Sequence, residues 1–187
     1  MDVKAKKLRR EGYVTGNLFG REIEGSIPLK FTKKEIEVLL KNNNKGSQVM
    51  LELDGKTYDA LIKEVDYNPL AHTVEEVDFQ ALVSNEMVHS VAEIILENEE
   101  MVVSGVLQDE LKEVAYKALP ADLVDKIKVD VAGMKIGDTL RVKDLEIAKN
   151  KNIHITTDLE SVIATVTPVH NVVPEAETAT EDAAEEK

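Results

Sequence analysis

The sequence contains no cysteine, and no stretch of it is apolar enough to cross a membrane. The absence of cysteine excludes disulfide bonds and cysteine-ligated zinc, and it agrees with a reducing compartment. A membrane-spanning helix needs about 20 apolar residues in a row, and the charged segment 1–12 is not a secretory signal. We therefore expect a cytoplasmic protein without a membrane partner.

The sequence also lacks an active-site pattern. No serine lies in a Gly-x-Ser-x-Gly elbow, and the segment from Gly133 to Gly137 is not a phosphate loop, because Asp138 follows it in place of lysine. The four histidines have no metal-ligand spacing; they are His72, His89, His154 and His170. We predict a protein that is not an enzyme, with no catalytic residue, metal site, cofactor or small-molecule substrate.

Acidic residues are abundant but unevenly placed. Of the net charge of −13, residues 81–187 carry −12 and residues 1–80 carry −1. Segment 1–12 is basic, with five Lys and Arg side chains against two acidic ones. Because a polyanion binds to local positive charge rather than to net charge, this asymmetry favours a nucleic-acid-binding start of the chain. By themselves, five basic residues are equally compatible with a solvated cluster.

One helix and one hairpin are clearly marked. Thr32 with Glu35 forms a capping-box pattern that predicts a helix from this point to about residue 42. Asp54-Gly55 predicts a type I′ turn between two strands. In that hairpin Leu51 is opposite Tyr58 and Val49 is opposite Ala60, which makes one face of the hairpin apolar.

The remaining pattern is mostly that of short strands. Residues 74–83 alternate between apolar and polar, and we place a domain boundary near residues 84–85. Beyond it, five strand-like runs are punctuated by glycine and proline, which predicts a second β-rich unit; the runs are 88–96, 111–118, 127–131, 139–142 and 162–166. Residues 172–187 are acidic, without aromatic residues, and are expected to be a disordered tail.

A series of short motifs resembles the bacterial 5S-rRNA-binding ribosomal protein family, in its long two-domain form known as general stress protein CTC. No single motif is specific, but their order covers nearly all of the chain except the tail. The motifs are Lys7-Leu8-Arg9-Arg10-Glu11-Gly12, Leu18-Phe19-Gly20, Val77-Asp78-Phe79-Gln80, Gly105-Val106-Leu107-Gln108, Leu119-Pro120, Ile127-Lys128-Val129-Asp130-Val131-Ala132-Gly133 and Ile136-Gly137-Asp138-Thr139-Leu140.

The resemblance implies a mainly β fold. Residues 1–84 would form a 5S-rRNA-binding β-barrel of six or seven strands with one or two short helices, and residues 85–171 a β-rich CTC-type C-terminal domain. The implied partners are 5S rRNA and the large ribosomal subunit, and charge complementarity adds neighbouring basic ribosomal proteins as candidates. The RNA-binding residues that we predict are Lys4, Lys6, Lys7, Arg9, Arg10, Phe19, Arg21, Glu76 and Asp78.

Several positions depart from the family pattern. Glu76 occupies the place of a histidine, Phe19 that of a tyrosine and Thr15 that of a proline. The family also has a strand with another RNA-contacting arginine ahead of the basic segment, so we expect either a misassigned start at Met1 or a truncated barrel with an exposed edge. For Phe19, packing in the core is as reasonable as stacking on RNA.

Two functions therefore remain open at this point. The first is a structural ribosomal protein that grips RNA phosphates. The second is a stress-related protein-interaction module that keeps the fold with weakened RNA binding. The idea that gathered cations grip the RNA requires that Arg9 and Arg10 lie on the same surface as Asp78 and are not surrounded by acidic groups; otherwise the ribosomal assignment rests on the family resemblance alone.

Overall fold

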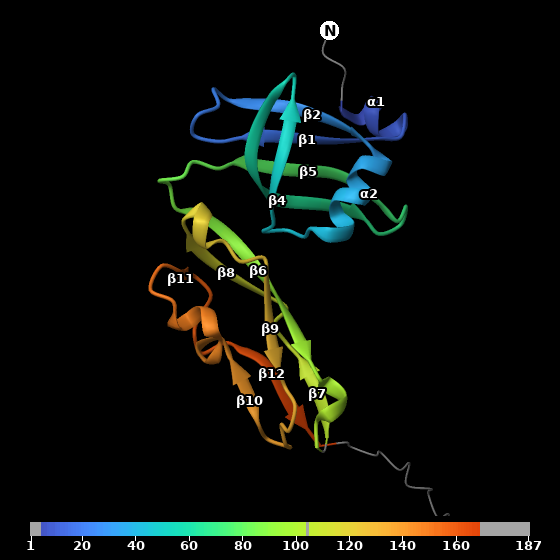
Figure 1. Ribbon diagram of the computed structural model, residues 1–187. Coiled ribbons are helices and arrows are strands. Elements are labelled where there is room, and N and C mark those ends of the chain that lie inside the picture. Colours follow the sequence, from blue (N-terminus) through green and yellow to red (C-terminus); the bar gives the residue numbers. More distant parts are fainter. Residues whose placement is uncertain (1–4, 104, 169–187) are drawn as a thin grey trace, which may run out of the picture.

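The computed structural model describes residues 5–103 and 105–168, which form two groups of strands that follow each other along the long axis of the molecule (Figure 1). The predicted acidic tail, 172–187, lies outside the described residues. In the described ranges no helix is long and apolar enough to span a membrane.

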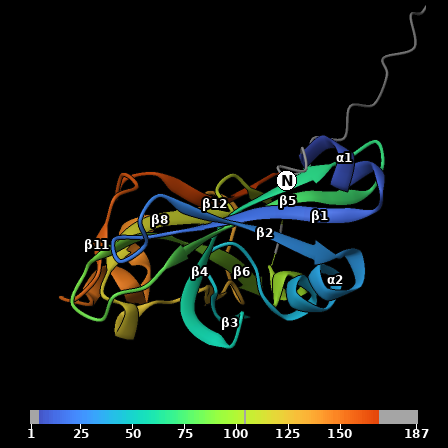
Figure 2. The same ribbon diagram turned by 90° about the horizontal axis from the view of Figure 1, so that it is seen from above.

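The first group is a five-stranded curled sheet with the order β2-β1-β5-β4-β3. Its neighbours are antiparallel except for β1 and β5, which run parallel. Figures 1 and 2 both place helices α1 and α2 at the same end of this sheet. The elements are α1 (Ala5–Arg10), β1 (Tyr13–Phe19), β2 (Ser26–Thr32), α2 (Lys33–Asn42), β3 (Gln48–Leu53), β4 (Lys56–Asn68) and β5 (Thr73–Ala81).

The local rules read from the sequence hold in this sheet. The Thr32 hydroxyl accepts from the backbone N–H of Glu35, whose carboxylate accepts in return from the Thr32 N–H at 2.7 Å, so the capping box is confirmed. The turn residues at 54 and 55 have φ angles of 49° and 79°. The hairpin register also matches the prediction, with Leu51 opposite Tyr58 and Val49 opposite Ala60.

Apolar side chains that alternate along the strands fill the interior of the curled sheet. Val14 and Leu18 of β1, with Val77 and Phe79 of β5, are almost completely buried, and Ile36 of α2 closes the same cluster. The sheet buries one face because residues two apart along a strand point to the same side. The opposite, outward face is therefore left for polar contacts.

The mainly β fold class is confirmed, but the count of six or seven strands in the first unit is not. The described residues supply five, all of which follow the basic segment, and that segment is helical. No helix was predicted there from the sequence. Two α-helices agree with the expectation of one or two.

The second group contains two smaller sheets, with the orders β11-β8-β6-β9 and β10-β12-β7. All five predicted runs contain a strand, while β7 and β11 were not predicted. Within the described part of this group, four short 3-10 helices lie between the strands. The strands are β6 (Val88–Glu97), β7 (Val106–Asp109), β8 (Glu113–Ala118), β9 (Lys126–Asp130), β10 (Thr139–Arg141), β11 (His154–Ile155) and β12 (Val162–Thr167).

The two groups have separate buried clusters but are joined by polar contacts. One cluster extends to residue 81 and the other begins at residue 92. At the junction the Lys63 ammonium donates to the His89 carbonyl oxygen at 2.8 Å, and Lys45 lies 3.8 Å from Glu113. Gly46 has a φ of 90°, and a Cβ there would be 2.0 Å from the Val91 carbonyl oxygen. The boundary between domains 1–84 and 85–171 stays a prediction, compatible with these clusters.

Candidate nucleic-acid interface

Helix α1 displays the basic segment on the surface of the molecule. Lys6, Lys7 and Arg10 are exposed, and the cations of the last turn complement the negative end of the helix dipole. Gly12, with a φ of 89°, ends the helix by donating its N–H to the Arg9 carbonyl oxygen at 3.1 Å. Lys7 lies 3.8 Å from Glu11, an exposed pair that constrains it little. Lys4 lies outside the described residues.

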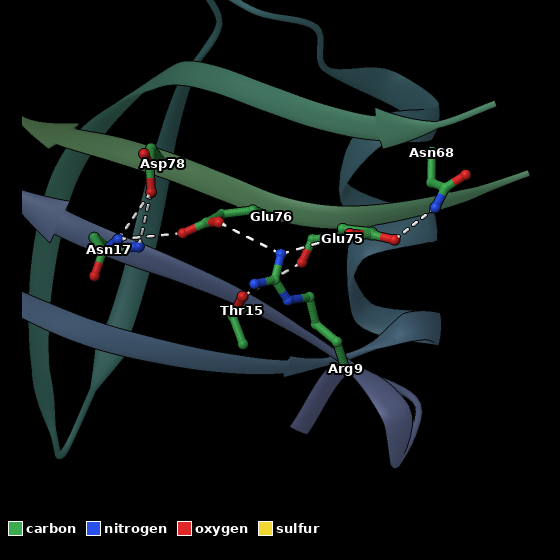
Figure 3. A network of polar contacts seen from close by, with 7 residues as sticks. All are labelled: Arg9, Thr15, Asn17, Asn68, Glu75, Glu76 and Asp78. Atoms are coloured by element: carbon green, nitrogen blue, oxygen red, sulfur yellow. Dashed lines mark hydrogen bonds and ion pairs between the residues drawn. The ribbon is translucent and has the colours of Figure 1, made fainter. Parts of the chain in front are cut away.

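Arg9 differs from the other cations because it is held by two carboxylates (Figure 3). Its Nη1 atom is 3.5 Å from Glu75 and 3.8 Å from Glu76, and about a third of its side chain is exposed. Asn68 donates to the second oxygen of Glu75 at 2.7 Å, which fixes that carboxylate in place. The Arg9 guanidinium is therefore already neutralised within the protein.

A β-bulge explains why two consecutive glutamates reach the same arginine. In the pairing of β4 with β5, Asp66 is opposite Glu76 and Tyr67 is opposite Val74, so Glu75 has no partner. An extra residue in one strand breaks the alternation of side chains between the two faces. Glu75 and Glu76 therefore both point toward α1 (Figure 3).

The predicted aspartate of β5 is also engaged inside the sheet. Asp78 Oδ1 accepts from the backbone N–H of Asn17 at 3.1 Å and from its side-chain amide at 3.3 Å. The same amide donates to Glu76 at 3.4 Å. Asn17 is opposite Asp78 in the parallel pair of β1 and β5, so backbone register alone brings the two together. Among the described residues the second oxygen of Asp78 has no hydrogen-bond donor, whereas the second oxygen of Glu76 faces Arg9 at 3.8 Å.

The outward face that bears Asp78 is acidic. In register, Glu64 of β4 is opposite Asp78 and Asp66 is opposite Glu76, and these four carboxylates line an open cavity of about 260 Å³. Lys30 on the same face sits 3.7 Å above the ring of Tyr13 rather than beside a carboxylate. The expectation that cations and carboxylates are kept apart is wrong at Arg9, since sheet register places acidic strands next to α1.

Two further predicted residues lie at the other end of β1. Phe19 is half-buried, opposite Ser26 and Gln80. Among the described residues, Phe19 belongs neither to the buried cluster of the sheet nor to the partly buried side chains packed against that cluster. Packing in the core therefore does not account for Phe19. Arg21, with 76% of its side chain exposed, lies 3.9 Å from Glu86. Neither residue contacts the Arg9 network.

Two members of this site were not predicted from the sequence. Asn17 and Glu75 connect the predicted residues, yet neither type of side chain stands out in the sequence. Asn17 was detectable in part, because the polar residues at 15 and 17 alternate with Val14, Gly16 and Leu18 along β1. Glu75 was not detectable, because its orientation depends on the bulge.

Comparison with known proteins gives matches along both groups of strands. Residues 2–79 match the model of the Ribosomal L25p family, and residues 87–170 match that of the C-terminal domain of ribosomal protein TL5. A large ribosomal subunit protein bL25 from Carboxydothermus hydrogenoformans is 33% identical over 96% of this chain and 89% of its own length. The protein of that name from Akkermansia muciniphila is 30% identical over 97% and 90%, and that from Bacillus velezensis is 29% identical over 95% and 85%.

Proposed function

Because this chain belongs to the ribosomal L25p family, we propose that it binds 5S ribosomal RNA as part of the large ribosomal subunit in the cytoplasm. Members of this family are structural ribosomal proteins and not enzymes. The observation that carries the proposal is the match over nearly the whole chain, at 33% identity across 96% of its residues. The domain division at residues 84–85 is part of the proposal, with residues 1–84 as the RNA-binding unit.

The geometry of α1 supports phosphate binding by its exposed cations. Lys6 and Arg10 have no carboxylate within 4 Å among the described residues, and Lys7 has only the exposed Glu11. Cations that meet phosphates release counterions, which makes binding favourable at low salt and weak at high salt. Arg10 adds a planar fork that can contact two phosphate oxygens.

The polar face of β1 and β5 supports a second kind of contact. An A-form helix exposes ribose 2′-hydroxyls along its wide minor groove. The second carboxylate oxygen of Asp78, and the Glu76 oxygen that faces Arg9 at 3.8 Å, can accept hydrogen bonds from these hydroxyls or from amino groups of bases. Arg9 offsets part of their charge, so the face is less repulsive toward RNA than four free carboxylates. In this proposal Arg9 positions the acceptors and Arg10 contacts the phosphates.

Filter binding of the full chain to 5S rRNA over a salt series tests the proposal. We expect binding at low salt, and a salt slope that falls by about 0.7–0.9 in Arg10→Ala. Lys56→Ala is the matched control, because Lys56 is exposed at the hairpin turn of the same sheet. Absence of binding at low salt, or equal effects of both variants, would refute the proposal and leave the protein-interaction module as the explanation.

A further inference from the structure

A row of basic side chains crosses three neighbouring strands of the second group. His89 of β6 is directly opposite Lys117 of β8, and Lys117 is directly opposite His154 of β11. All three residues are exposed. Directly paired residues lie on the same face of a sheet, and neighbouring strands are about 4.8 Å apart. The three side chains therefore form one line, about 10 Å long, in the more acidic half of the chain.

A second bulge brings a lysine from the first group to the end of this line. In the pairing of β4 with β5, Ile62 is opposite Phe79 and Glu64 is opposite Asp78, so Lys63 has no partner. Its freed side chain reaches across the junction and donates to the His89 carbonyl oxygen at 2.8 Å. Lys45, Lys63 and His89 line the same cavity of about 260 Å³.

The charges in this cationic row, which we define as Lys63, His89, Lys117 and His154, are weakly balanced. Within residues 5–103 and 105–168, Lys63 and Lys117 have no carboxylate within 4 Å, although Glu64 lines the same cavity and Lys45 is paired with Glu113. Burial, then Lys117 and Lys63, lower the pKa of His89, and burial and Lys45 lower that of Lys63.

Lys117 is directly paired with a histidine on each side, and among the described residues these pairs supply no ion pair that would stabilise the sheet. Folding alone therefore gives no reason to gather these side chains, whereas an anionic ligand does. We propose that the cationic row binds the phosphate backbone of RNA, as a contact separate from α1. This rests on the proposed function, because a protein of the large subunit is surrounded by RNA and by basic proteins, and the row repels the latter.

The side chains suit phosphates better than base edges. Lysine is a compact charge that contacts phosphate without reading sequence. A histidine ring next to it can donate to a phosphate oxygen or stack on an unpaired base. We therefore expect binding that is sensitive to salt and indifferent to sequence.

Nuclear magnetic resonance of the imidazole C–H groups can separate this contact from the first one. His89 and His154 report on the cationic row, whereas His72, in the connection between β4 and β5, reports on the five-stranded sheet. On addition of a short RNA duplex of arbitrary sequence to the full chain, we expect the signals of His89 and His154 to move, and added salt to reverse the change. The titration gives the dissociation constant of this contact.

Two lysine variants make the test specific. Lys117→Ala should raise that dissociation constant about fivefold and lower its salt slope by about one. Lys126→Ala, which removes the same charge from β9 at the other edge of the same sheet, should change neither. Circular dichroism of both variants checks that they are folded.

Each result then has one meaning. Movement of His72 alone, together with 5S rRNA binding, would overturn the cationic row and leave the proposed function intact. Movement of His89 and His154, together with a 5S rRNA salt slope that Arg10→Ala leaves unchanged, would overturn the assignment of 5S rRNA to α1 and support the row. Equal movement with polyglutamate in place of RNA would overturn the assignment to RNA in favour of an acidic protein.

Discussion

Removal of the carboxylate of Glu76 is expected to strengthen RNA binding, although this residue lies within the proposed interface. In the structure Glu76 holds Arg9 at 3.8 Å and shares the outward face with three other carboxylates. The substitution Glu76→Gln keeps the shape of the side chain and one acceptor oxygen, which still can accept from Asn17. It removes a negative charge and loosens one of the two contacts that neutralise Arg9.

The size of the gain follows from the exposure of the pair. About a third of each side chain is exposed, so the Arg9–Glu76 contact resembles a surface ion pair of about 0.2–1 kcal/mol. Repulsion between a carboxylate and a phosphate about 10 Å away adds about 0.4 kcal/mol in water before salt screening. Together these give about 0.6–1.4 kcal/mol, which is a dissociation constant about three- to tenfold lower.

Filter binding with 5S rRNA measures this change, and two further variants isolate its cause. Asp66→Asn removes a charge from the same face, opposite residue 76 in register. Among the described residues Asp66 forms no ion pair with Arg9, so this variant reports the repulsion alone. Combining Glu76→Gln with Arg9→Ala completes a double-mutant cycle. If the gain acts through Arg9, Glu76→Gln lowers the dissociation constant more than Asp66→Asn does. In the presence of Arg9→Ala, the effect of Glu76→Gln then falls to about that of Asp66→Asn.

Weaker binding by Glu76→Gln would refute this reasoning. It would mean that the hydrogen bonds that Glu76 accepts from the RNA need its negative charge, and that they outweigh the repulsion. An unchanged dissociation constant in both single variants would mean that the outward face of β4 and β5 does not approach RNA at all.

Three predictions concern stability. Tyr116→Phe should lower the free energy of unfolding by about 1–3 kcal/mol in urea titrations, because the buried hydroxyl both donates to and accepts from the backbone of Val124 at 2.7 Å; an unchanged value would contradict this. Thr32→Ala should cost about 1 kcal/mol in thermal unfolding through the lost N-cap. The Asn98 side chain and a backbone N–H lower the pKa of Asp130 by donating hydrogen bonds to its carboxylate. The stability that these hydrogen bonds contribute is therefore present above the ordinary carboxyl pKa and is lost as pH falls through the lowered pKa. The stability advantage of the native chain over Asn98→Gly should therefore shrink on acidification, and an advantage independent of pH would count against it.

The local elements of the fold were predictable because their causes are local. The capping box needs only residues 32 and 35, and the hairpin needs a turn whose two residues tolerate positive φ angles. Alternation of apolar residues then identified the buried face of each strand. Helix α1 was missed because six mostly charged residues have no apolar stripe long enough to suggest a helix.

The sequence predicted residues that belong to the site, but not how they contact one another. Arg9, Glu76 and Asp78 came from the family resemblance, and the structure places all three in one network (Figure 3). Their relation to one another was not predictable, since Arg9 was expected to be free for phosphate and is held by Glu75 and Glu76. Arg9 meets these carboxylates because β1 pairs in parallel with β5, which lies about sixty residues further along the chain.

The sequence by itself determined the kind of protein: its mainly β class, its family and the position of its basic segment. These follow from composition, short-range spacing and the order of motifs, which do not change on folding. Only the tertiary structure decided which charges meet. Two β-bulges turn Glu75 toward Arg9 and Lys63 toward His89, and strand register aligns His89, Lys117 and His154. A single extra residue in a strand redirects the side chains around it, so the electrostatic surface depends on pairings between distant segments.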